Sequence, residues 1–158
     1  MEPKDYVLKM KDISIKKLTL LDEIFLFARS QNEVIKDKRF EEMDLLIREK
    51  QQRIEAVDKL DEQFAECSSK LREMLSVKSL EELPRFNLPG TKELREVIES
   101  IFQKLKDIRE IDDENISLVK AEMKDIKKKL NGVSNNKRIQ GAYNPPMNMT
   151  SHFFDQKK

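Results

Sequence analysis

The fold is decided by residues 39–75, which read RFEEMDLLIREKQQRIEAVDKLDEQFAECSSKLREML and contain neither Pro nor Gly. Apolar residues recur along this stretch at alternating steps of three and four, which is the spacing of one face of an α-helix. That face consists of Phe40, Met43, Ile47, Ile54, Val57, Leu60, Phe64, Cys67, Leu71 and Met74. Because so narrow an apolar stripe needs a second helix to cover it, the stretch predicts a helical bundle.

The composition of the whole chain favours the same fold. Charged residues make up 39% of the 158 residues and Gly occurs only 3 times, which suits long exposed helices better than a sheet with tight turns. Lys and Arg number 31 against 30 Asp and Glu. Since the charges nearly cancel, no basic field concentrates the phosphates of a nucleic acid, and we expect no nucleic-acid partner.

Cysteine content and hydropathy indicate where the chain works. Cys67 is the single cysteine, so it can form no internal disulfide, and its position within the apolar stripe predicts that it packs as a small apolar residue. The first eleven residues have no apolar run followed by a cleavage site, and no apolar run approaches the roughly 18 residues of a spanning helix. We expect a cytoplasmic protein without membrane insertion.

A first helix is predicted over residues 4–34, and it carries two neighbouring apolar stripes. One stripe consists of Met10, Ile13, Leu20, Ile24, Phe27 and Val34, and the other of Val7, Leu18, Leu21, Phe25 and Ala28. A helix with two stripes contacts two partners. Either it is the middle helix of a three-helix bundle, or its second stripe lines a groove for a client, in which case Leu18, Leu21 and Phe25 are candidate client contacts.

The apolar pattern lapses between Gln31 and Arg39, and we place the chain reversal there. Asp37 is a candidate N-cap for a second helix over residues 39–76. Neither Pro nor Gly forces the turn, so one continuous kinked helix is the alternative.

Residues 77–91 form the clearest break in the helical pattern. Ser79 followed by Glu82 matches a capping box that opens one helical turn, which we expect Pro84 to stop. The apolar residues of this loop either cover the end of the bundle or contact a client. Thr91 is the expected N-cap of a third helix over residues 92–131, and Gly132 is expected to end that helix.

The apolar seam of the third helix is interrupted by Asp112 and Asn115; its other members are Leu94, Ile98, Ile101, Leu105, Ile108, Val119, Ile126 and Leu130. Two interpretations compete. A buried Asn in a helical seam commonly sets the register and the number of helices. Alternatively, the seam opens at this point and admits water or a client.

The C-terminal tail, residues 133–158, changes to Ser, Asn, Gly, Pro and Met, which excludes further helix. It still contains many apolar residues: Ile139, Tyr143, Met147, Met149, Phe153 and Phe154. The tail either folds back onto its own helices or is a mobile arm that contacts a partner. Together these segments predict an all-α fold, an elongated antiparallel three-helix coiled-coil bundle over residues 1–132 with a non-helical C-terminal tail.

Residue types that carry catalysis or bind metals are scarce. His152 is the only His, so no pair of His ligands and no His-based triad can form. The three Gly are isolated, and none follows a strand-like run as a phosphate-binding loop requires. The sequence therefore predicts no catalytic residue, no metal site and no cofactor, and we expect a binding protein and not an enzyme.

Two segments resemble the bacterial flagellar export chaperones of the FlgN family. The first is DDENISL at residues 112–118, and the second runs from Ala142, Tyr143 and Asn144 to the ending FFDQKK at residues 153–158. The order of segments is similar too: a helix, a longer charged helix, a break, a third helix with an Asn-containing motif, and a polar tail. In that motif Asn115 and Leu118 match the family, and in the tail Tyr143, Phe153, Phe154 and Asp155 match.

The resemblance implies a cytoplasmic chaperone of flagellar type III export that has no enzymatic activity. Its clients would be the hook-filament junction proteins, whose helical terminal segments it would bind, preventing premature assembly and aiding delivery to the export apparatus. The candidate client contacts are then Leu18, Leu21, Phe25, Asn115, Leu118, Tyr143, Met147, Met149, Phe153 and Phe154. Alternatives are a chaperone for another client, such as the filament cap, and a self-associating structural coiled coil or adaptor in which the seams are homodimer contacts.

Overall fold

The computed structural model describes residues 1–133 and shows helices throughout that part of the chain. The α-helices are α1 (Pro3–Lys36), α2 (Met43–Leu75) and α3 (Thr91–Val133), and the 3-10 helices are η1 (Phe40–Glu42) and η2 (Leu80–Phe86). No strand occurs among residues 1–133, so the prediction of an all-α fold is confirmed. The coiled-coil packing and the elongated form remain predictions, and residues 134–158 of the expected tail lie outside the described part.

The chain forms two compact units. Unit 1 comprises Met1–Leu26 and Gln52–Ile108, and unit 2 comprises Phe27–Gln51 and the chain from Arg109 onward. Each long helix therefore contributes one segment to each unit.

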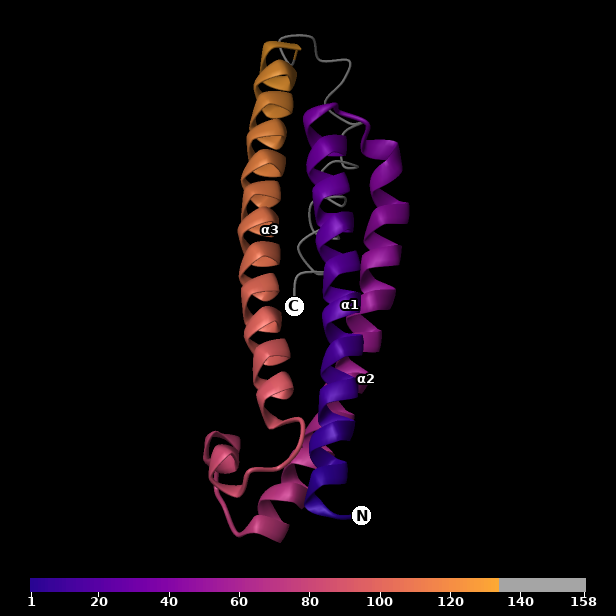
Figure 1. Ribbon diagram of the computed structural model, residues 1–158. Helices are drawn as coiled ribbons and strands as arrows, with labels where there is room; N and C mark the ends of the chain where they lie inside the picture. Colours follow the sequence, from indigo (N-terminus) through magenta and orange to yellow (C-terminus); the bar gives the residue numbers. More distant parts are fainter. Residues whose placement is uncertain (134–158) are drawn as a thin grey trace. The chain divides into compact units, whose positions relative to one another are not determined.

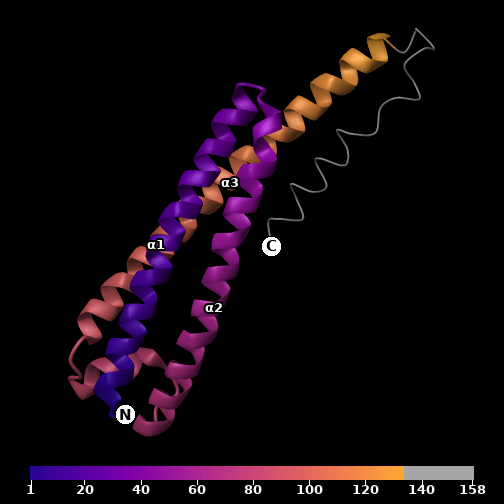
Figure 2. The same cartoon turned by 90° about the vertical axis from the view of Figure 1, so that its right-hand side faces the viewer.

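Within unit 1 the first two helices run antiparallel and side by side (Figures 1 and 2). Val7 of α1 packs in the same cluster as Leu71 of α2, whereas Leu21 further along α1 packs with Val57 earlier in α2. The third helix runs parallel to α1, because its Leu94 joins the Val7 cluster and its Ile101 joins the Leu21 cluster.

Three apolar clusters form the core. The first two belong to unit 1. One consists of Val7, Met10, Ile13, Cys67, Leu71, Leu83 and Leu94. The other consists of Leu21, Ile24, Val57, Ile101 and Ile108. The third belongs to unit 2 and consists of Val34, Ile35, Met43 and Ile47. Cys67 is 4% exposed and unpaired, so the prediction that it packs as a small apolar residue is confirmed.

The chain begins α1 with local signals that the sequence contains. Pro3 is the first helical residue, a position where its missing N–H costs no hydrogen bond. Asp5 accepts a hydrogen bond of 2.8 Å from the backbone N–H of Glu2, which places a carboxylate at the positive end of the helix dipole.

Two helices end at residues in the left-handed region that are not glycine. After α1, Lys38 has φ 57°, its N–H donates to the Ile35 carbonyl, and the Arg39 N–H donates to the Val34 carbonyl. After α2, Ser76 has φ 54°, and the backbone N–H groups of Ser76 and Val77 donate the two equivalent hydrogen bonds. This is the Schellman pattern, in which Gly is the usual residue because a side chain costs free energy there.

The reversal between α1 and α2 is shorter than the sequence indicated. Gln31 and Asn32 remain helical, and the chain turns after Lys36. The expectation that Asp37 caps the second helix is wrong, because η1 intervenes with Arg39 as its N-cap and no side chain bonds to that cap. Instead the Asp37 carboxylate pairs with the Arg39 guanidinium at 3.3 Å. The negative charge of Glu42 raises the pKa of Arg39, and together with Asp37 it outweighs desolvation, which lowers that pKa.

Around η2 the capping box is confirmed, but the expectation that Pro84 ends the helical turn is wrong. The Ser79 hydroxyl accepts from the Glu81 N–H at 3.2 Å, and the Glu82 carboxylate accepts from the Ser79 N–H at 3.4 Å. Pro84 lies inside η2 and does not stop it, because the fixed φ of proline, about −65°, is compatible with a 3-10 helix, which continues to Phe86.

The ends of α3 also differ from expectation. Gly90 at φ 87° accepts the Leu94 N–H and so precedes the helix, while Thr91 is its first residue and donates its hydroxyl to the Leu88 carbonyl at 2.8 Å. Gly132 does not end the helix, which continues to Val133. An isolated Gly within a helix costs only about 1 kcal/mol, too little to end a helix of this length.

Two positions of the predicted apolar seams are exposed. Met74 is 47% exposed near the end of α2, where Leu75 packs against the core in its place. Leu105 of α3 is 40% exposed, although its neighbours Ile101 and Ile108 are buried. The α2 seam is otherwise buried or half-buried along its length.

The left-handed stop after α2 predicts opposite effects of the same substitution at two serines. Ser76→Gly should raise the free energy of unfolding by about 0.5–1 kcal/mol, because glycine adopts φ 54° without the steric cost. Ser69→Gly, at an exposed position inside α2, should lower it by a similar amount. Chemical denaturation followed by circular dichroism measures both, and destabilisation by Ser76→Gly would contradict the account.

Candidate functional site

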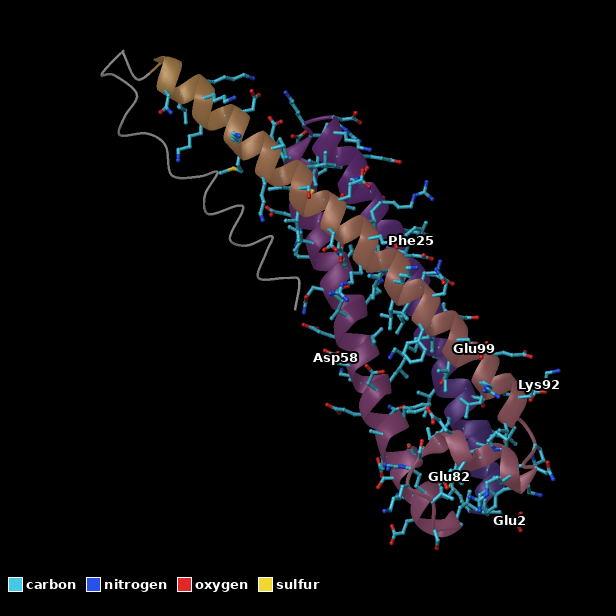
Figure 3. The ribbon with its side chains drawn as sticks, turned by 90° about the vertical axis from the view of Figure 1, so that its left-hand side faces the viewer. Glu2, Phe25, Asp58, Glu82, Lys92 and Glu99 are labelled. Carbon is cyan, nitrogen blue, oxygen red and sulfur yellow. The ribbon has the colours of Figure 1, made fainter. Side chains whose placement is uncertain are left out.

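Unit 1 contains an apolar groove of about 630 Å³. Residues from α1, α2, η2 and the first half of α3 line it. Figure 3 labels Glu82 on η2, together with Lys92 and Glu99 on α3, the two elements that form its walls. A volume of this size lies within the range of protein ligand sites.

The floor of the groove is the core itself. Ile13 of α1, Leu83 of η2 and Leu94 of α3 line the groove and are 2–5% exposed. All three belong to one core cluster, so the groove opens directly onto packed apolar side chains. An apolar side chain inserted there would be removed from water on several sides.

The α3 wall presents apolar side chains to solvent. Ile98, Phe102 and Leu105 lie on the lining at spacings of four and three residues, which places them on one helical face. Phe102 is 68% exposed and Leu105 is 40% exposed. Single exposed apolar residues are ordinary, but a row of them beside an apolar groove is typical of a binding surface.

The 3-10 helix η2 also lines the groove, through Leu80, Leu83 and Pro84. The capping box orders the start of this short helix, and the buried Leu83 anchors it to the core. The polar rim includes Lys17 and Asp61, whose ammonium and carboxylate groups lie 2.7 Å apart.

In unit 2 a polar layer joins α1 to α3. Asn115 is fully buried; its amide nitrogen donates to the Ala28 carbonyl at 2.9 Å, and its amide oxygen accepts from the Asn32 side chain at 2.9 Å. Every buried side-chain polar atom of the described residues has a hydrogen-bond partner. Since one register alone satisfies both Asn115 bonds, this arrangement favours the interpretation that Asn115 sets the register.

The same layer contains a nearly buried cation on α2. The Lys50 ammonium lies 2.6 Å from the Asp112 carboxylate of α3 and 3.3 Å from the Gln31 side-chain oxygen of α1. Lys50 is 8% exposed, so the ion pair is shielded from solvent. It ties α2 to α3 where the interrupted seam of α3 supplies a carboxylate in place of an apolar residue.

A family profile described as FlgN protein matches residues 6–151 of this sequence. The match covers most of the chain and includes every element described above. The chain belongs to the FlgN family. No match was found among curated proteins, and none among solved structures. Membership confirms the resemblance to the family, with residues 112–118 inside the matched range and residues 153–158 beyond it, and it assigns this FlgN-family chain to the flagellar export chaperones.

The structure places the predicted client contacts of this FlgN-family chain outside the groove. Leu21 is 3% exposed in the core of unit 1, while Leu18 and Phe25 are half-buried against the same cluster. The ring of Phe25 lies under the Lys104 ammonium, 4.8 Å from its centroid. Leu118 is half-buried against the core of unit 2. Client binding by these residues stays a prediction.

The remaining predicted contacts lie outside the described residues. They are Tyr143, Met147, Met149, Phe153 and Phe154. Their role in client binding likewise stays a prediction.

The most exposed large apolar residue of the groove, Phe102, was absent from the predicted seams. The predicted seam of α3 includes Ile98, Ile101 and Leu105, and Phe102 lies next to Ile101 in the sequence. A signal did exist, because Ile98, Phe102 and Leu105 form a second stripe at steps of four and three. Because this stripe shares Ile98 and Leu105 with the predicted seam, the two widen one apolar face of α3.

Two other kinds of feature, a metal site and a membrane-spanning helix, are absent from residues 1–133. Among residues 1–133 no group of three His, Cys, Asp or Glu is arranged to hold a metal ion. No helix in that part of this FlgN-family chain combines the length and the apolar character needed to span a membrane.

The polar layer predicts a loss of stability when Asn115 is replaced. Asn115→Leu leaves the buried Asn32 side-chain amide without its partner, removes the second hydrogen bond to the Ala28 carbonyl, and should lower the free energy of unfolding by about 1–3 kcal/mol. The double variant Asn32→Leu with Asn115→Leu should recover part of that loss, because the unpaired Asn32 amide is removed. Denaturation curves of the three proteins measure both effects, and an additive double variant would contradict the pairing.

Proposed function

We propose that this chain is a cytoplasmic chaperone of flagellar type III export that binds the helical terminal segment of a hook-filament junction protein. Binding would prevent premature assembly and aid delivery to the export apparatus. It would act by binding alone, without catalysis, metal or cofactor. Family membership supports the chaperone role, and the junction-protein client is our proposal.

The observation that carries this proposal is the groove of unit 1 with Phe102 and Leu105 exposed on its wall. An amphipathic helix recognises such a groove through apolar anchors at steps of three and four, which match the spacing of the α3 wall. Phe102 has the size and position of an anchor residue, since aromatic side chains dominate the energy of many interfaces.

The fold supports a groove that exists before the client binds. Its floor belongs to a packed core cluster, and η2 is held by its capping box and by Leu83. A preformed groove leaves most of the ordering cost to the client segment, which would fold as it binds. Such coupled folding reduces the net affinity, which suits a chaperone that must release its client.

We extend the proposal to the rest of the chain. Residues 1–132 would act as one three-helix coiled-coil bundle, and the tail from residue 133 would add Tyr143, Met147, Met149, Phe153 and Phe154 to the client surface. Leu18 and Phe25 would contribute from half-buried positions. Leu21, Asn115 and Leu118 would support the client-bound form through the packing of the helices.

One alternative uses the same surface. The exposed Phe102 and Leu105 would also suit a homodimer contact, which would make the protein a self-associating coiled coil or adaptor. A different flagellar client, such as the filament cap, is a second alternative. Comparing terminal segments of junction and cap proteins in one binding assay separates the clients, and sedimentation of the chain alone separates the dimer.

Removing the exposed aromatic ring should weaken client binding. Phe102→Ala should lower the affinity for a junction-protein terminal segment about tenfold, because an anchor residue loses its contact area. Leu26→Ala is the matched control, since Leu26 is 59% exposed on α1 and does not line the groove. Titration calorimetry measures both variants, and equal affinities would show that the groove is not the client site.

The proposed role of the tail has its own test. A chain stopped at Gly132 should bind the same junction-protein segment more weakly than the full chain if the tail contributes contacts. Tighter binding would mean instead that the client displaces the tail. Identical affinities for the two chains would contradict any role of the tail in client binding.

A further inference from the structure

The rim of the groove carries more carboxylates than cations. Asp61, Glu81 and Glu99 line it on three elements, against Lys17 and Arg95. The Lys17 ammonium is engaged with Asp61 at 2.7 Å. Two carboxylates and one cation then remain to meet an incoming partner.

The Arg95 and Glu99 side chains form only a loose pair. Their charged atoms lie 3.8 Å apart, and the side chains are 74% and 71% exposed. Exposed pairs of this kind contribute little and are easily exchanged for another partner. Glu99 is therefore available to a cation on a bound segment.

Glu81 is the rim carboxylate without an ion pair. No Lys or Arg of residues 1–133 lies within ion-pair distance of it, and its side chain is exposed on η2. Its backbone N–H bonds to Ser79, but its carboxylate takes no part in the capping box, which uses Glu82. The capping box thus fixes the position of Glu81 on the wall while leaving its charge unused.

From these charges we propose that the groove selects an amphipathic helix with a Lys or Arg beside its apolar stripe, and that Glu81 pairs with that cation. The inference rests on the proposed function and specifies the chemistry of its client segment. Apolar anchors would contact Phe102, Leu105 and the floor, while the flanking cation reaches Glu81 on η2. The apolar contacts supply most of the affinity, and the charge selects between segments of similar apolar content.

Two designed helical peptides test this selection. They share one leucine stripe at steps of three and four, and their flanking positions carry Lys in one peptide and Glu in the other. Fluorescence anisotropy measures their binding to the full chain, to Glu81→Gln, to Glu81→Lys and to the control Glu55→Lys. Glu55 is an exposed carboxylate of α2 that does not line the groove.

The wild-type chain should bind the Lys-flanked peptide about two- to fivefold more tightly, the range expected for one exposed ion pair. Glu81→Gln should reduce this preference to the share contributed by Glu99, Glu81→Lys should abolish or reverse it, and Glu55→Lys should leave it unchanged. Added salt should shrink the preference without abolishing binding, since the apolar contacts remain. Circular dichroism confirms that each variant is folded.

Several outcomes would overturn the inference. They are equal binding of the two peptides, a preference that survives Glu81→Lys, and a preference lost equally in Glu55→Lys. Peptide affinity that falls as the chain concentration rises would assign the groove to a second copy of the chain. Tighter binding of both peptides after removal of residues 134–158 would assign it to that segment.

The test separates this inference from the proposed function. Because the peptides share no sequence with flagellar proteins, their charge preference can hold while a junction-protein segment fails to bind, which would remove only the proposed client. Conversely, a junction-protein segment that binds wild type and Glu81→Lys equally would retain the client and overturn the role of Glu81.

Discussion

The anchoring of η2 by Leu83 is the contact on which the groove of unit 1 depends. Leu83 is 2% exposed among residues of α1, α2 and α3, so the connection between α2 and α3 is packed into the core. The capping box of Ser79 and Glu82 orders the backbone around it. With η2 held in this position, η2 and the apolar side chains Ile98, Phe102 and Leu105 of α3 line a space that residues 1–133 leave open.

The two units hold their helices together by different means. Unit 1 uses two apolar clusters, whereas unit 2 combines one small apolar cluster with the polar layer of Asn32, Asn115, Lys50 and Asp112. Apolar contacts tolerate small shifts of one helix along another, but paired amides do not, because a shift leaves buried polar groups without partners. A polar layer therefore favours one register of α3 in unit 2, while in unit 1 an apolar face of α3 with Phe102 and Leu105 stays exposed.

Local signals in the sequence predicted the helices and the capping box correctly, and they failed at the helix ends. Residues 39–75 contained the periodicity of α2, and Ser79 with Glu82 formed the expected box. The helix ends at Lys38 and Ser76 could not be predicted, because neither position carries a glycine. Tertiary packing compensates there for the cost of a left-handed residue with a side chain. At Gly132 the sequence predicted a helix end that does not occur, since nothing at that position requires a left-handed backbone.

The sequence by itself determined the all-α fold, the apolar faces of the helices and membership of the FlgN family, because periodicity and motif residues are local properties of the chain. Only the tertiary structure decided which apolar residues stay exposed. Phe102 and Ile101 are adjacent in sequence and equally apolar, yet one is 68% exposed and the other 6%. Their difference arises because α1 and α2 cover one face of α3, and a helix cannot bury two faces against neighbours that reach only one.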